Sequence, residues 1–154
     1  MKKLYLFLLL SLSLGVNAQY YSITYVNVPP ENQAEFANIE TTYWSKVAKA
    51  AIDAGNQSAW GLVAAIGDVP SGWTHAFVNV YETAEDLANS ASNWDPSSVL
   101  GIDQSLLNTV KLTDGGFSVQ NWAVQTSLSA GERTAESVTV WNFARPENLA
   151  GFIN

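Results

Sequence analysis

A seven-residue sequence that occurs twice is the feature that most limits how this chain can fold. Pro30–Phe36 and Pro146–Phe152 share Pro, Glu, Asn, Ala and Phe at matching positions. A strand-like run precedes each copy, and proline both ends a strand and suits the first turn of a helix. The repeat therefore predicts two strand-to-helix hinges, which belong to one complete α/β unit and to the beginning of a second.

Residues 1–18 have the pattern of a secretory signal peptide. Lys2 and Lys3 form a charged start, and Leu4–Leu14 is an uncharged apolar stretch. Ala18 completes the pattern of small residues after which signal peptidase cuts. We therefore expect cleavage near Ala18 and export of the remaining chain, either to the periplasm or as a secreted protein. The apolar stretch is shorter than the roughly 20 residues of a spanning helix, so we expect no membrane segment in the mature chain.

The composition of the mature chain is typical of a globular domain without cross-links. Hydrophobic residues make up 47% of the sequence, and there is no Cys to form a disulfide. Without Lys2 and Lys3 the chain has five basic and fourteen acidic residues, a net charge of −9. Such a charge repels nucleic acid and anionic lipid. Because one His and no Cys cannot build a thiolate or multi-histidine site, we expect no metal and no cofactor.

Hydrophobic periodicity predicts an alternation of strands and helices. Strands are predicted over residues 20–28, 58–66, 74–81 and 117–128. Helices are predicted over 30–53, from a capping sequence at Thr83 onward, and in part of 97–112. Asp114–Gly116 is predicted to be a turn. The order is β-α-β-β-α-β, which is an α+β, ferredoxin-like unit with a four-stranded antiparallel sheet.

The first helix is predicted to bury one face. Apolar residues recur at spacings of three and four, at Phe36, Ile39, Tyr43, Val47, Ala50 and Ala54. The charged residues Glu35, Lys46 and Lys49 fall mostly on the other sides. We therefore expect the apolar face to lie toward the core.

The domain organisation follows from the repeat. Residues 19–128 form the ferredoxin-like unit, 129–134 form a polar linker, and 135–154 begin a second, truncated unit. The second helix stops nine residues after it begins, whereas its first copy runs for about 24. We therefore expect the natural protein to continue beyond Asn154.

The strand at 74–81 has two different faces. One face consists of small or branched side chains, at Thr74, Ala76, Val78 and Val80. The other is larger and partly polar, with His75, Phe77, Asn79 and Tyr81. We expect the small face to lie under the helices and the aromatic face to be open. An open apolar face of this size should pack on another sheet, from a second chain in a homodimer or from the tandem unit.

This layout resembles the dimeric α/β-barrel superfamily, which includes antibiotic-biosynthesis monooxygenases and EthD-like and NIPSNAP-like proteins. The resemblance covers about residues 20–128 and the partial repeat. The resemblance implies a barrel cavity that holds a small apolar or aromatic ligand. Several members of the superfamily catalyse oxygenation without a cofactor. Some relatives degrade haem with an Asn, Trp and His set. Asn27, Trp60 and His75 supply those residue types, but His75 begins a strand where the family's His lies on a helix, which argues against haem.

The residues predicted to form the site lie mainly on the aromatic face. His75 is the candidate catalytic base, because a histidine titrates near neutral pH. The alternative is a structural histidine at the end of a strand that bonds to a loop. The candidate ligand-binding residues are Tyr25, Asn27, Trp60, Phe77, Asn79 and Tyr81. The aromatic ones and Trp122 could line a pocket or form the core of an interface, and we favour the interface core for most of them. The leading hypothesis is therefore an exported small-molecule-binding protein, and the resemblance implies an oxygenase-like activity. The alternative is a non-catalytic module whose open face serves only assembly.

Overall fold

A computed structural model of the chain describes residues 19–67 and 72–125. The chain divides into two compact units, Met1–Ala123 and Val124–Asn154. The predicted signal peptide, the linker at 129–134 and the second unit at 135–154 lie outside the described residues, so they stay predictions.

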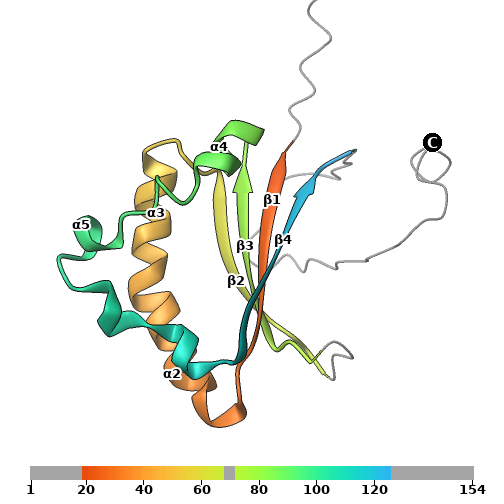
Figure 1. Cartoon of the computed structure of the whole chain (residues 1–154), viewed down its shortest axis with the longest axis vertical. Coiled ribbons are helices and arrows are strands. Elements are labelled where there is room, and N and C mark those ends of the chain that lie inside the picture. Colours follow the sequence, from red (N-terminus) through yellow and green to blue (C-terminus); the bar gives the residue numbers. More distant parts are fainter. Residues whose placement is uncertain (1–18, 68–71, 126–154) are drawn as a thin grey trace, which may run out of the picture. The chain divides into compact units, whose positions relative to one another are not determined.

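The first unit contains one antiparallel sheet of four strands (Figure 1). The strands are β1 (Tyr20–Asn27), β2 (Ala59–Ala64), β3 (His75–Tyr81) and β4 (Asp114–Ala123). Their order across the sheet is β2-β3-β1-β4, and every neighbouring pair is antiparallel. The predicted ferredoxin-like α+β fold is confirmed.

The predicted helix over 30–53 is also confirmed, with an irregular middle. A 3₁₀ turn, Pro30–Asn32, leads into α2 (Gln33–Ile39), a π-helical turn (Glu40–Trp44) and α3 (Ser45–Asp53). After β3 come α4 (Ala84–Asn89), α5 (Pro96–Leu100) and the 3₁₀ turns Gln104–Leu107 and Thr109–Leu112. The Thr83 hydroxyl accepts a hydrogen bond from the Asp86 N–H at 3.0 Å and caps α4, as predicted. None of the described helices has both the length and the apolar character needed to cross a bilayer.

The π-helical turn changes which residues the long helix buries. Phe36 and Val47 are buried as predicted, but Glu40, Ala48 and Ala51 are buried too. Ala54, predicted on the buried face, is exposed. A regular helix turns about 100° per residue, and a π turn takes up one more residue than an α turn. The prediction from regular α-helical spacing was therefore wrong in the second half of the helix.

The prediction of which sheet face lies under the helices was wrong. The Phe36 ring of α2 lies 5.3 Å from the His75 ring and 5.9 Å from the Phe77 ring, measured between centroids. The aromatic face of β3 therefore packs under α2, on the side where Figure 1 places the long helix. Ala76 and Val78 point away from it, as does Tyr25, which pairs with Ala76.

The turn predicted at Asp114–Gly116 is instead the first part of β4. Gly115 and Gly116 have φ of 77° and 74°, a conformation that L side chains rarely adopt. The pairing of β1 with β4 shifts between Val26 and Asn27, opposite this end of β4. The two glycines therefore permit a bulge within the strand, where the sequence pattern indicated a break.

Replacing Gly116 with alanine should destabilise the unit by about 1 kcal/mol, because the left-handed conformation is strained for any residue with a Cβ. Gly61→Ala is the matched control, since Gly61 lies in β2 and a Cβ there would meet nothing within 4 Å. We expect Gly61→Ala to be neutral or slightly stabilising. Urea denaturation of both variants tests this, and equal losses of stability would contradict it.

Candidate functional site

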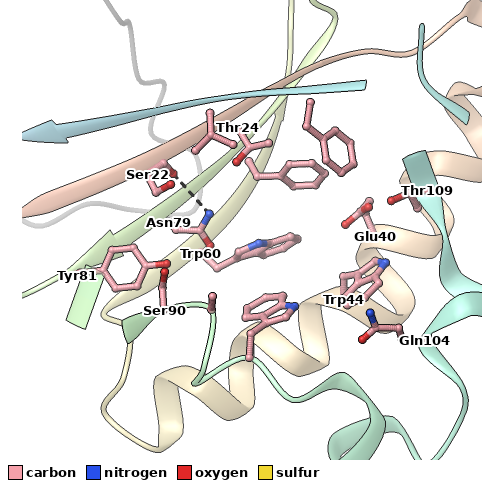
Figure 2. Close-up of a pocket in the computed structure, with 15 residues that line it drawn as sticks. Ser22, Thr24, Glu40, Trp44, Trp60, Asn79, Tyr81, Ser90, Gln104 and Thr109 are labelled. Carbon is pink, nitrogen blue, oxygen red and sulfur yellow. Dashed lines mark hydrogen bonds between the residues drawn. The ribbon is translucent and has the colours of Figure 1, made fainter. Parts of the chain in front are cut away.

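A cavity of about 600 Å³ lies between the sheet and the helical side of the unit (Figure 2). All four strands, the long helix and the segment between β3 and β4 contribute to its wall. The lining residues are Ser22, Thr24, Glu40, Trp44, Trp60, Phe77, Asn79, Tyr81, Ser90, Ala91, Trp94, Gln104, Thr109, Phe117 and Val119. The cavity therefore lies within one unit, on the helix-covered face of the sheet.

Aromatic rings form much of the wall. Trp44 and Trp94 lie nearly parallel, at an interplanar angle of 12° and a centroid distance of 6.3 Å. Phe77 and Phe117 meet edge to face at 6.1 Å. Trp60 projects from β2 into the cavity, between Asn79 at one end and Glu40 at the other (Figure 2). This arrangement favours a ligand with a flat or compact apolar body.

Neutral polar groups gather at one end of the cavity. Figure 2 shows Ser22, Asn79, Tyr81 and Ser90 together there. The Asn79 amide is held by the protein itself, because its Oδ1 accepts from Gln57 Nε2 at 3.0 Å and its Nδ2 donates to the Ser22 carbonyl at 3.4 Å. Burial raises the pKa of Tyr81, opposed by a hydrogen bond with Ser90, so this phenol is neutral at pH 7.

Glu40 lies at the opposite end, in the π-helical turn. Its side chain is only 3% exposed and lies beside Thr109 (Figure 2). Burial raises the pKa of Glu40 to about 7, although a hydrogen bond from Thr109 works in the other direction. The carboxyl group therefore exchanges its proton near neutral pH, as groups at functional sites often do.

Local structure fixes the groups around Glu40. The Asn108 side chain accepts a hydrogen bond from the Val110 N–H at 3.1 Å and caps the 3₁₀ turn that begins at Thr109. Trp44 Nε1 donates to the Leu107 carbonyl at 3.3 Å, which ties the long helix to the same segment. These bonds hold Thr109 and Trp44 in place at the cavity wall.

Four of the seven predicted site residues line this cavity, namely Trp60, Phe77, Asn79 and Tyr81. Tyr25 lies on the opposite sheet face, where its ring packs against Trp73 at 5.1 Å. Asn27 ends β1 and does not line the cavity. Trp122 pairs with Tyr21 and so also faces away from it.

His75 lies apart from the large cavity. It lines a smaller one, of about 320 Å³, together with Gln33 and Thr74. Its Nδ1 lies 3.0 Å from the Thr74 hydroxyl, and burial lowers the pKa of the ring, so His75 is neutral at pH 7. A catalytic role for His75 stays a prediction, separate from the groups gathered around Glu40.

Sequence reasoning missed Glu40, Trp44, Trp94 and Thr109. One signal was available, because Phe36, Glu40 and Trp44 are spaced by four and so lie near one face of a helix. An acidic residue among aromatic neighbours at that spacing indicates a buried carboxyl group. Trp94 and Thr109 lie in irregular segments, where periodicity gives no face.

Within residues 19–67 and 72–125, no three His, Cys, Asp or Glu side chains gather closely enough to hold a metal ion.

Comparison with known proteins identifies the fold. No known family profile matches the sequence, and no curated protein does. A dimeric ferredoxin-like protein from an uncultured marine organism superposes with a TM-score of 0.54 at 10% identity, covering 75% of this chain and 94% of that one. Hydroxynitrile lyase from Passiflora edulis gives 0.48 at 12% identity, over 73% and 99% of the two chains. A Bordetella bronchiseptica protein provisionally assigned as an antibiotic biosynthesis monooxygenase gives 0.44 at 15%, over 72% and 99%. The chain has the ferredoxin-like fold that its sequence predicted.

Proposed function

We propose that this protein binds a small, largely apolar, aromatic molecule in the cavity between its sheet and its helices. The observation that carries the proposal is the wall itself, in which Trp44, Trp60, Trp94, Phe77 and Phe117 surround about 600 Å³. Small-molecule sites typically have volumes of about 300–1,000 Å³ and combine an apolar lining with a few polar groups. The polar groups at the two ends would orient the ligand, and the rings would supply most of the contact area.

We also propose that the protein acts outside the cytoplasm, because residues 1–18 have the charge and hydrophobic pattern of a signal peptide. N-terminal sequencing of the exported protein is the test. A first residue at Gln19 is expected, and retention of Lys2 and Lys3 in that protein would contradict the proposal.

We also propose that the protein forms a homodimer. The sheet face away from α2 carries the Tyr25–Trp73 ring pair and the exposed side chains of Val63 and Trp122. The marine ferredoxin-like protein with this fold is dimeric. Sedimentation velocity should record twice the chain mass, and a monomer at micromolar concentration would contradict this part alone.

Binding can be tested with 4-tert-butylbenzyl alcohol as a neutral aromatic probe. We expect Trp94→Ala to weaken its binding by about tenfold, because the variant removes one of the two stacked indoles from the wall. Isothermal titration calorimetry gives both dissociation constants.

Trp73→Ala is the matched control, because Trp73 packs on Tyr25 and does not line the cavity. Its affinity for the probe should equal that of the unmodified protein. If both variants lose affinity equally, the cavity is not the binding site of the probe.

A further inference from the structure

The charge distribution around Glu40 is the starting point. Fifteen of the described residues line the cavity, and none of these is Lys, Arg or His. The two titratable groups in the wall are Glu40 and Tyr81, which lie at opposite ends (Figure 2). Among the described residues, the hydrogen-bonding partner of the Glu40 carboxyl is the neutral Thr109 side chain. Within the part of the chain that the structure describes, the cavity therefore contains a buried acidic group and no basic side chain to neutralise it.

The aromatic rings of the cavity also favour positive charge. The face of an indole carries negative potential and attracts a cation within about 6 Å of the ring centroid. Trp44, four residues after Glu40 on the same helix, stacks with Trp94, and Trp60 projects into the same cavity. Aromatic faces and a carboxylate both favour positive charge, so the wall has one consistent preference.

We propose that the cavity selects an organic ammonium cation, with the ammonium group between Glu40 and the tryptophans and the rest of the ligand toward Tyr81 and Ser90. This inference rests on the proposed function, because it specifies the charge of a ligand for the same cavity. A quaternary or protonated amine attached to an aromatic or compact apolar body has the required chemistry. The Glu40 carboxylate faces a positive charge in the complex, whereas an anionic ligand would meet it without any compensating base.

If a cation binds beside Glu40, the carboxyl group should also release a proton. Because the pKa of Glu40 lies at about 7 without ligand, much of the protein carries a protonated carboxyl at neutral pH. A cation beside this group favours the ionised form and lowers its pKa. Binding at pH 7 should therefore release up to about half a proton per ligand. Tyr81 contributes no proton, because its phenol is neutral at pH 7 and lies at the far end of the cavity.

The experiment compares two probes that have the same shape and differ in charge. (4-Hydroxymethylphenyl)trimethylammonium carries the cation, and 4-tert-butylbenzyl alcohol replaces its nitrogen with carbon. At pH 7.5 we expect the protein to bind the ammonium probe about tenfold more tightly than the alcohol. Glu40→Gln should remove most of this preference, measured as the ratio of the two dissociation constants in that variant. Glu35→Gln, which removes an exposed carboxylate from α2, should retain the preference.

A measurement on the unmodified protein avoids any dependence on the variants. The binding enthalpy of the ammonium probe, measured in phosphate and in Tris, should differ in proportion to the protons released. The enthalpy for the neutral alcohol should be the same in both buffers.

The outcomes separate the two proposals. If the neutral alcohol binds at least as tightly as the ammonium probe at pH 7.5, the cation inference is overturned and the proposed function stands. If neither probe binds, the proposed function fails and the inference fails with it. A tenfold preference that persists in Glu40→Gln, without proton release, would also overturn the assignment of the carboxyl as the selective group.

Discussion

Phe36→Ala is expected to lower the free energy of unfolding by about 3–5 kcal/mol, the largest loss that we expect from a single substitution in this unit. The Phe36 side chain is 0% exposed and forms a core cluster with Val26 and Val28. Its ring also contacts His75 and Phe77 on β3. Removing it would therefore leave a cavity where the long helix meets the sheet.

Phe117→Ala is the matched control for this prediction. Phe117 is also a phenylalanine that contacts Phe77, but it is 43% exposed at the cavity wall. We expect its truncation to lower stability by about 1 kcal/mol, because the side chain loses little buried area. Guanidinium denaturation of both variants gives the comparison. Similar losses would show that Phe36 does not hold the helix on the sheet.

Glu40→Gln is expected to raise stability at pH 8 by about 3 kcal/mol and to leave it nearly unchanged at pH 4. Burial raises the pKa of Glu40 from 4.5 to about 7 in the folded protein. Below pH 4.5 the carboxyl is protonated in both the folded and the unfolded chain, so it has no effect on stability. Between pH 4.5 and 7 the unfolded chain releases this proton first, so stability falls as the pH rises. Glutamine cannot ionise and avoids this loss.

The measurement for Glu40 is urea denaturation at pH 4, 6 and 8. The difference in stability between Glu40→Gln and the unmodified protein should grow with pH and level off above about 7. Glu35→Gln again serves as the control, because this exposed residue should change stability by less than about 0.5 kcal/mol. A pH-independent difference for Glu40→Gln would mean that ionisation of Glu40 is not opposed by the fold.

The sequence was sufficient to predict the order of the strands and helices, because each has a strong local pattern. Val28 is followed by two prolines that end β1, and Thr83 marks the start of α4. The two faces of β3 were also separated correctly. The face that lies under the helices was not predicted correctly, because the alternation of side chains separates His75 from Ala76 without showing which of them faces α2. Small side chains were expected beneath the helices, but the rings of Phe36, His75 and Phe77 fill that space.

Four of the fifteen residues that line the cavity could be predicted from strand periodicity. Trp60, Phe77, Asn79 and Tyr81 share one face of two paired strands, which follows from strand periodicity. The other wall comes from irregular backbone, in the π-helical turn and the segment between β3 and β4. Those positions depend on long-range contacts, such as that between Trp44 and Leu107, which are 63 residues apart. Local pattern carries no information about such contacts.

A π-helical turn closes its hydrogen bonds over five residues, so it holds one residue more than the α-helical turn that could replace it. If one residue within Glu40–Trp44 were deleted, this turn could become ordinary α-helix, and α2 and α3 could keep their present contacts. Phe36 and Val47 would keep their places in the core, whereas the carboxyl of Glu40 would be lost or moved. A single-codon deletion could thus erase the ligand preference and spare the architecture.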